Sequence, residues 1–334
     1  MLRISQDSPL NLTPIGTPAP LPGTFPTTVT ASSRLGTVCV ATTGSAAGLT
    51  CAPFSPATGL GEFDALRVFD LNQSTPPVGP TNTVSHAFFA SDQSSVFVTV
   101  KGDPAANKTG FLANFPVVVD NNNQNGKGKG KATKRGGRGF RGGGGPSNSN
   151  SRVSTGVVAK EGIFSSPNGT AVLFGSAAVS SGQQQQILAT DASFGAALLS
   201  VDDATGQASI VGAPAAVDNQ AATCWATISP FTGTAFVTDV GRNRLVEVSF
   251  QDDVGAKVVG EIDLSAVSAA RNDPGLIDLM AGGELVYALS PGNNSGNAPP
   301  AISVVNVRTR ELVQHVQLAG VGANGNAMGM ALHF

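Results

Sequence analysis

Residues 222–241 read ATCWATISPFTGTAFVTDVG, a short apolar strand, a small polar turn, a second apolar strand and a glycine. The same pattern returns loosely, roughly every 45 to 60 residues, at 25–44, 82–102 and 274–292, and more weakly at 170–193. Self-similarity at this period is typical of arrays of four-stranded antiparallel units, whose usual closed form is a β-propeller. We therefore predict an all-β fold, a β-propeller of four-stranded blades, with a β-sandwich as the alternative.

Each unit is interpreted as strands A to D, ordered from the ring axis outward. Five whole units are expected, preceded by a C–D pair at 2–5 and 10–15 and followed by an apolar run at 328–334, shaped like another strand A. Strand D is expected at 65–71 in the first unit and at 153–159 in the second. Most strands alternate or form short apolar runs, as in sheets packed face to face.

The composition favours a single β-propeller domain over residues 1–334. The chain is 41% hydrophobic and 13% charged, and only 264–272 has a plausible helical pattern. No run of 18 apolar residues suggests a membrane span. The first residues lack the basic and apolar regions of a signal peptide and enter the repeat midway. We therefore expect a chain that is incomplete at its N-terminus, and a monomer.

The segment 121–152 interrupts the second unit between strands C and D. It holds eight of the 20 Lys and Arg residues and none of the 22 Asp and Glu, which leaves twelve basic against 22 acidic side chains elsewhere, a formal charge of −10. Its Gly-, Lys- and Arg-rich composition predicts disorder. Arg-Gly-Gly sequence with an interleaved Phe also occurs in RNA-binding tails, so RNA binding through this insert is a minor alternative to a solvated basic loop.

Two of the three cysteines flank a loop of small residues. If Cys39 and Cys51 lie on adjacent antiparallel strands, their Cβ atoms come within reach of a disulfide, which would indicate maturation in an oxidising compartment. Two buried thiols are the alternative. Cys224 is left over beside the single tryptophan and is expected to be a buried free thiol.

Four segments carry a resemblance to a known family: TVCVATTGSAAGLTC (37–51), LNQSTPPVGP (71–80), QILATDASFG (186–195) and AATCWATISPFTGTAFVTDVG (221–241). With these, the chain resembles the fungal secreted 3-carboxymuconate cyclase-like proteins of the lactonase-type seven-bladed propeller group. The resemblance covers nearly the whole chain outside the insert. It implies seven blades in the full form, a secretory signal upstream, glycosylation, a cell-wall location and a lactonising activity that needs no cofactor.

Lactonisation of a carboxymuconate needs cations to hold carboxylates and an acid/base to move one proton. The inner strands and the loops that follow the second strands are where such groups would meet. His86 is the candidate acid/base, and Arg242 and Arg244 are the candidate carboxylate holders. The alternatives are a hydrogen-bonded histidine in its strand and a solvated turn for the arginine pair.

Other polar or reactive side chains fall at similar positions: Asp191, Cys224, Trp225, Asp239 and Asp278. The first and fourth recur at the end of a second strand, in ATDAS and VTDVG, where an aspartate can cap a turn by accepting backbone N–H bonds. A carboxylate ring that binds Ca²⁺ is the lesser alternative. Three histidines without close pairing do not suggest zinc, so no metal or cofactor is expected.

Two hypotheses for function remain open. One is a cofactor-free lactonising or lactone-hydrolysing enzyme acting on a small anionic or lactone substrate. The other is a non-enzymatic secreted or cell-wall glycoprotein that binds a glycan or a protein. Permissive N-glycosylation sequons occur at Asn11, Asn72, Asn107, Asn168 and Asn293.

Overall fold

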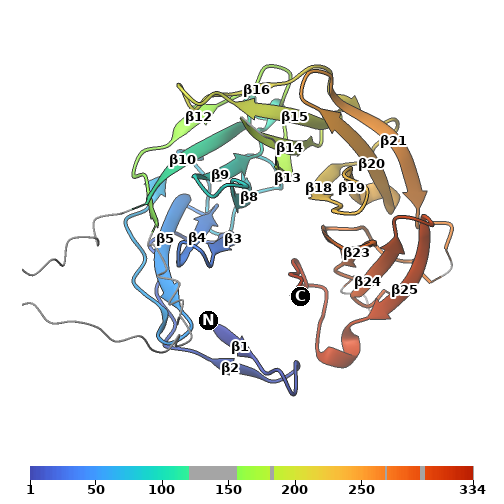
Figure 1. Ribbon diagram of the computed structural model, residues 1–334, viewed down its shortest axis with the longest axis horizontal. Coiled ribbons are helices and arrows are strands. Elements are labelled where there is room, and N and C mark those ends of the chain that lie inside the picture. The colour runs from blue at the N-terminus through green and yellow to red at the C-terminus, as the bar shows by residue number, and fades with distance from the viewer. Residues whose placement is uncertain (120–155, 181–183, 268, 294–297, 334) are drawn as a thin grey trace, which may run out of the picture.

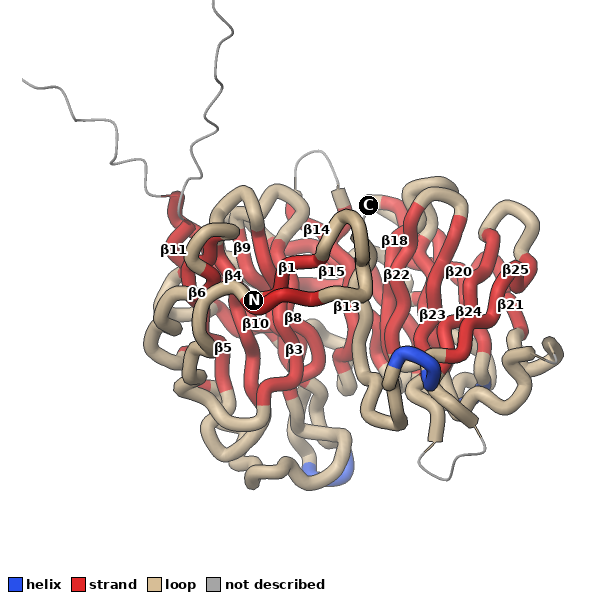
Figure 2. The backbone as a smooth tube through the Cα atoms, turned by 90° about the horizontal axis from the view of Figure 1, so that it is seen from below, coloured by secondary structure: helices blue, strands red, loops and turns tan. Residues whose placement is uncertain are grey.

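The computed structural model describes residues 1–119, 156–180, 184–267, 269–293 and 298–333. In these residues, five small antiparallel sheets follow one another along the chain and surround a common centre (Figure 1). The strands run between two rims of loops (Figure 2). The predicted all-β propeller is therefore confirmed, with five blades, and the β-sandwich is excluded. The insert predicted at 121–152 lies outside the described residues.

In each blade the strands pair in chain order from the centre outward. The first blade contains β3 (Pro26–Ser32), β4 (Thr37–Thr42), β5 (Gly48–Ser55), β6 (Gly59–Leu60) and β7 (Arg67–Val68). The second contains β8 (Val84–Phe89), β9 (Ser95–Val100), β10 (Phe111–Val119), β11 (Gly156–Val158) and β12 (Ile163–Ser165). The third contains β13 (Leu173–Val179), β14 (Gln185–Asp191), β15 (Gly195–Val201), β16 (Ala208–Ile210) and β17 (Ala215–Ala216).

The last two blades have four strands each. The fourth contains β18 (Thr223–Ile228), β19 (Ala235–Asp239), β20 (Arg244–Gln251) and β21 (Gly255–Asp263). The fifth contains β22 (Asp278–Gly282), β23 (Leu285–Ser290), β24 (Ala301–Asn306) and β25 (Glu311–Gln317).

In the first three blades the outermost strand is split into two short pieces. β6 and β7 both pair with β5, β11 and β12 with β10, and β16 and β17 with β15. The continuous strand predicted at 65–71 is therefore wrong, because only β7 pairs there. The backbone passes so close to β5 at this point that a Cβ on Gly48 would lie 2.2 Å from the carbonyl oxygen of Arg67. Only glycine permits this approach.

The core lies between the blades, and alternate residues of the second strands fill it on both sides. In β9, Val96 and Val98 pack toward the first blade and Phe97 toward the third, and all three are buried. Successive side chains of a strand point to opposite faces, so a strand enclosed by two neighbouring sheets is apolar on both. Four apolar clusters of this kind join the five blades.

The two ends of the chain differ from the blades. β1 (Leu2–Ile4) and β2 (Leu12–Pro14) form an antiparallel hairpin, as predicted for 2–5 and 10–15. The strand predicted at 328–334 is wrong for the described residues 328–333, which form no strand and turn toward the centre of the ring (Figure 1). The Met330 N–H donates to Asp278 Oδ2 at 2.8 Å, so a side chain takes the bond that a paired strand would have made.

Helical structure in the described residues is limited to short 3₁₀ turns, at Pro104–Ala106, Val240–Arg242 and Ala319–Val321. The described part of the range 264–272 forms turns, in place of the helix that its sequence pattern suggested. None of the described helices is long and apolar enough to cross a membrane.

The structure places a disulfide between Cys39 and Cys51. The two residues are direct cross-strand partners on β4 and β5, with their Cα atoms 4.0 Å apart. Both are buried in the cluster between the first and second blades. Cys224 is a buried free thiol, as predicted, and burial raises its pKa to about 11.

A buried polar cluster ties the outer part of the fifth blade to the segment that leads into it. Ser303 on β24 lies 3.1 Å from Nδ1 of His315 on β25, and His315 Nε2 lies 3.7 Å from Asp273 Oδ1. The Asp273 side chain is 6% exposed, and its Oδ2 has no hydrogen-bond partner. Burial raises the pKa of Asp273 above its usual value, against the opposing effects of His315 and Ser303.

This cluster predicts a pH-dependent stability. A carboxyl whose pKa is higher in the folded than in the unfolded state stabilises the fold at low pH, and that contribution is lost as the pH rises through the folded-state value. The wild type therefore loses this contribution as the pH rises from 4 to 7, and Asp273→Asn does not. The free energy of unfolding of Asp273→Asn is expected to increase over this range relative to that of the wild type. Urea unfolding of both proteins across this range measures the difference, and a difference that does not change with pH would contradict it.

Candidate functional site

A central channel of about 1010 Å³ lies inside the ring and is the candidate ligand site. Its walls come from the inner strands β3, β8, β18 and β22 and from the segment that turns inward at the end of the described chain. The lining residues are Leu21, Pro26, Thr27, Thr28, Val29, Thr30, Ala31, Val40, His86, Trp225, Asp278, Met280, Met328, Gly329, Met330 and Ala331. Most are apolar or uncharged, with a few polar groups among them, which is the usual character of small-molecule sites.

Irregularities near the start of the inner strands set the directions of the wall side chains. The register shifts between Val84 and His86 in β8, and between Thr223 and Ala226 in β18, and β3 and β13 shift at similar places. A bulge adds an unpaired residue and redirects the side chains beside it. His86 and Trp225 both lie at such shifts and both line the channel.

A repeated threonine on the second strands holds these irregular segments in place. Thr99 Oγ1 donates to the carbonyl of Phe174 at 2.6 Å, and Thr190 Oγ1 lies 2.5 Å from the carbonyl of Cys224. Each of these bonds reaches the bulge of the following blade. Thr238 Oγ1 accepts from the N–H of Trp225 at 3.1 Å within its own blade. All three hydroxyls are buried, so the bulges are fixed by groups shielded from water.

Aromatic rings form a continuous wall around His86. Its imidazole stacks on Phe88 with the ring centres 5.1 Å apart and meets Trp225 edge-on at 5.3 Å. Trp225 in turn contacts Phe174 edge-on at 5.4 Å. Lys101 Nζ lies 4.2 Å from the centre of the Phe174 ring, and burial lowers its pKa to about 8. The lysine is not among the residues that line the channel.

His86 is held as a neutral hydrogen-bond donor. The backbone N–H of Ser176 donates to Nδ1 at 3.3 Å, so Nδ1 carries no proton and the ring hydrogen is on Nε2. Burial lowers the pKa of His86 to about 4, which keeps the ring uncharged at neutral pH. The imidazole of this lining residue therefore keeps Nε2–H as its donor, while the sequence suggested an acid/base without specifying its protonation state.

Asp278 is the carboxyl group of the channel. Its Oδ1 accepts from the N–H of Leu279 and its Oδ2 from the N–H of Met330, both at 2.8 Å. Burial raises the pKa of Asp278 above its usual value, against the effect of these two bonds. A carboxylate with a raised pKa is a better proton acceptor than an exposed one, so this side chain suits a general base.

The structure does not bring Arg242 and Arg244 to the channel with His86. Arg242 ends a 3₁₀ turn and is exposed. Arg244 is bound to other groups, with Nε 3.0 Å from Asp239 Oδ2, Nη1 2.7 Å from Glu261 Oε2 and Nη2 2.7 Å from the carbonyl of Asp218. Its donors are taken up by carboxylates of its own blade and a neighbouring carbonyl.

Of the two recurring aspartates, Asp191 caps the turn that follows it, as predicted, whereas Asp239 makes no side-chain cap bond to the 3₁₀ turn after it. Asp191 accepts from the N–H groups of Ala171, Val172 and Ser193, and Asp239 accepts from the N–H of Ala221 at 2.8 Å. Both carboxylates are buried. The described residues contain no cluster of three or more His, Cys, Asp or Glu side chains that could hold a metal ion.

Several lining residues were not singled out from the sequence. Met280 lies two residues after Asp278 on β22, so strand alternation was the signal that could have placed the two on one face. On β3 consecutive residues line the channel, so alternation would not have selected among them. Met328 and Met330 fall in the run expected to form another inner strand, so the sequence placed them near the ring axis, and the structure brings them there without a strand.

The asparagines of the five sequons lie on the surface. In each case the residue is exposed, and Asn72 and Asn107 adopt left-handed backbone conformations in loops. The described positions are Asn11, Asn72, Asn107, Asn168 and Asn293.

Comparison with known proteins places the fold. No protein-family model matches the chain, and no curated protein matches it in sequence. A solved structure from Bacteroides uniformis, described as a 6-phosphogluconolactonase, is 16% identical over 95% of this chain and 77% of its own, with a TM-score of 0.56. The periplasmic gluconolactonase PpgL from Pseudomonas aeruginosa is 11% identical over 95% of this chain and 78% of its own, with a TM-score of 0.55. At these identities the similarity shows a shared β-propeller fold.

Proposed function

We propose that the central channel binds a small cyclic ester and hydrolyses it without a cofactor. The observation that carries this proposal is the neutral His86, whose Nδ1 accepts from Ser176 and leaves Nε2–H as the donor, on a channel wall that it shares with Asp278. The fold shared with proteins described as lactonases supports it only by analogy.

The proposed step uses the two groups in different roles. Asp278 takes a proton from water while the water oxygen attacks the lactone carbonyl carbon, and the His86 Nε2–H donates to the oxygen on which negative charge develops. The ring C–O bond then breaks, and the leaving oxygen takes the proton from Asp278. The product is an open hydroxy acid, and both side chains return to their starting states.

Cyclisation of a carboxymuconate, as the family resemblance implies, is the alternative activity. Its substrate carries several carboxylates, which need cations close to the reacting atoms. The described lining of the channel includes no lysine or arginine, and Arg244 is bound to Asp239 and Glu261. The described lining therefore supports hydrolysis of a lactone better than cyclisation of a carboxymuconate.

Two substitutions at His86 test this function. His86→Asn keeps an acceptor near Nδ1 for Ser176 and removes the Nε2–H, so kcat is expected to fall about 100-fold, as on removal of an oxyanion donor. His86→Gln places an amide N–H nearer to the Nε2 position and should restore part of the activity. Hydrolysis of glucono-δ-lactone and δ-decalactone, followed by pH-stat titration, measures both variants.

Lys257→Ala, an exposed change on β21, serves as the control.

The hydrolysis rate of the wild type should decrease at pH values below the raised pKa of Asp278, because a protonated carboxyl cannot accept a proton from water. Full activity in His86→Asn, or no turnover of either lactone by the wild type, would overturn the proposal.

A secreted or wall-associated glycoprotein that binds a glycan or protein is the second candidate. It is favoured by the cross-strand disulfide Cys39–Cys51, which persists in oxidising compartments, and by five exposed sequon asparagines. We propose that the chain is made for the secretory route in either case. Mass spectrometry of the protein from culture supernatant, with and without glycosidase, tests this. An unglycosylated protein found only in the cell lysate would contradict it.

A further inference from the structure

We infer that the central channel takes an uncharged, largely apolar ligand, such as a lactone with an alkyl or aromatic body, in preference to a phosphorylated or carboxylated one. The inference rests on the proposed function of the channel, and it adds the class of substrate. It separates this chain from the substrate named in the description of the 6-phosphogluconolactonase neighbour.

The charge of the channel is the first reason. Among its described lining residues the titratable side chains are His86, which is neutral, and Asp278, which is either neutral or negative. A phosphate or carboxylate entering this site would lose water without gaining a cationic partner, and it would approach a carboxylate. Burial of an unpaired anion is strongly unfavourable.

Lys101, Arg242 and Arg244 are not among the described lining residues of the channel. The Lys101 ammonium lies over the Phe174 ring, and burial reduces its tendency to carry charge. Arg244 is bound by two carboxylates, and Arg242 is an exposed turn residue. An anionic ligand would therefore have to draw a cation away from these positions.

The apolar lining is the second reason. Trp225, Met280, Met328 and Met330 supply an indole ring and three thioethers. Methionine side chains are flexible and polarisable, so they adapt to apolar ligands of varied shape. The Thr28 hydroxyl accepts from the N–H of Ala87 at 3.1 Å, which leaves its own hydrogen free to bind one ester oxygen. This lining suits a ligand with a small polar head and an apolar body.

The single tryptophan makes the inference measurable. Because Trp225 lines the channel and is the only tryptophan of the chain, its fluorescence reports on binding there. We expect δ-decalactone to change this fluorescence saturably, with a Kd at least about tenfold lower than that of 6-phosphogluconate. Glucono-δ-lactone, which is neutral but polar, should bind between the two.

Two variants separate the channel from the rest of the surface. Met280→Lys adds a cation to the lining. It is expected to weaken the binding of δ-decalactone and to strengthen the binding of 6-phosphogluconate, so the preference for the apolar ligand should become smaller or reverse. Val313→Lys adds the same charge on β25 at an exposed position and should leave the preference unchanged. If Met280→Lys does not fold, Asp278→Asn serves instead, since loss of the carboxylate should selectively improve binding of the anion.

The outcomes distinguish the inference from the proposed function. Selective binding of δ-decalactone without hydrolysis would support the ligand class and overturn the activity. Hydrolysis combined with equal or tighter binding of the anion would leave the activity standing and overturn the ligand class. The absence of a saturable fluorescence change with any of the three probes would overturn the inference.

Discussion

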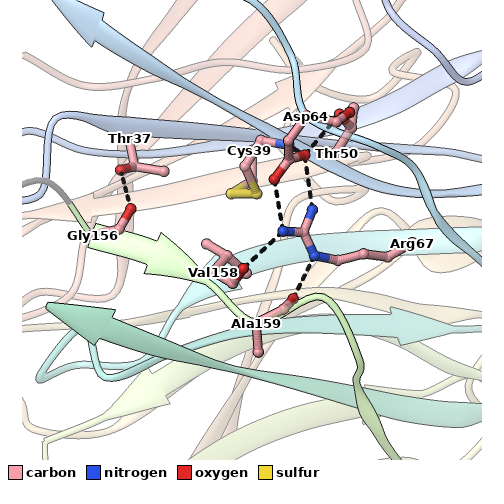
Figure 3. A network of polar contacts seen from close by, with 9 residues as sticks. Thr37, Cys39, Thr50, Asp64, Arg67, Gly156, Val158 and Ala159 are labelled. Atoms are coloured by element: carbon pink, nitrogen blue, oxygen red, sulfur yellow. Dashed lines mark hydrogen bonds and ion pairs between the residues drawn. A yellow bond between two sulfur atoms is a disulfide. The ribbon is translucent and has the colours of Figure 1, made fainter. Parts of the chain in front are cut away.

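Replacing Arg67 with methionine is expected to lower the free energy of unfolding by about 3 kcal/mol, because two backbone carbonyls lose hydrogen bonds from a buried charged donor, each worth about 1.5 to 3 kcal/mol. The Arg67 side chain is 5% exposed and joins the first blade to the second (Figure 3). Nε donates to the carbonyl of Ala159 at 2.6 Å and Nη2 to the carbonyl of Val158 at 2.8 Å. Methionine retains the apolar stem but leaves these carbonyls without their partner.

The same guanidinium forms a two-pronged contact with Asp64. Nη1 lies 2.9 Å from Oδ1 and Nη2 2.7 Å from Oδ2 (Figure 3). The N–H of Cys51 also donates to Oδ1. Partial burial would raise the pKa of Asp64, but the bonds from Arg67 and Cys51 hold it below its usual value. A lowered pKa contributes stability above the unfolded-state value that is lost as the pH falls through the folded-state value.

Urea unfolding at pH 7 and pH 3 measures both effects. The difference in the free energy of unfolding between the wild type and Arg67→Met should be larger at pH 7 than at pH 3. Arg308→Met is the matched control, because Arg308 pairs with Glu284 on the surface, where 60% and 41% of the two side chains are exposed. Its free energy of unfolding should fall clearly less than that of Arg67→Met, because solvent screens an exposed ion pair. Equal losses in the two variants would show that Arg67 does not join the blades.

Replacing Arg244 with methionine is expected to cost about 3 kcal/mol, because it leaves the Asp239 carboxylate buried without its cation. The Asp239 side chain is 0% exposed, and Arg244 is its partner at 2.9 Å. If Arg244 binds a carboxylate of the protein and not one of a substrate, Arg244→Met should lower the stability of the protein and leave the binding of a ligand in the channel unchanged.

A double substitution isolates this pair. Asp239→Asn combined with Arg244→Met removes both charges, and it should be more stable than Arg244→Met alone. Arg242→Met, at the exposed neighbouring position, should change stability by less than about 0.5 kcal/mol. Thermal and urea unfolding measure all three proteins. A double variant no more stable than Arg244→Met would contradict the buried pair.

Local features of the sequence predicted the repeated parts of the fold. Apolar alternation marked the inner and second strands, and an aspartate at the end of a strand marked the capped turn at Asp191. These features depend on residues within one hairpin. The outer strands were less predictable, because their pairing depends on how closely another part of the chain approaches, as at Gly48.

The candidate site was predicted only in part. His86, Trp225 and Asp278 were recognised as residues near the ring centre, and all three line the channel. Arg242 and Arg244 were grouped with His86 because they follow an inner hairpin, but the structure separates them from it. An arginine pairs with whatever carboxylate is close in space, and the turn sequence does not reveal that Asp239 and Glu261 are in reach.

Strand periodicity, turn residues and the repeated pattern can be read along the sequence, and together they were enough to predict a β-propeller. The chemistry of its centre depends on contacts between residues that are distant in the sequence. The protonation of His86 depends on the N–H of Ser176, 90 residues away, and its direction depends on a bulge in β8. Met330 reaches the same channel through a bond to Asp278, 52 residues distant. Such contacts arise when separate blades pack, so no local pattern in the sequence encodes them.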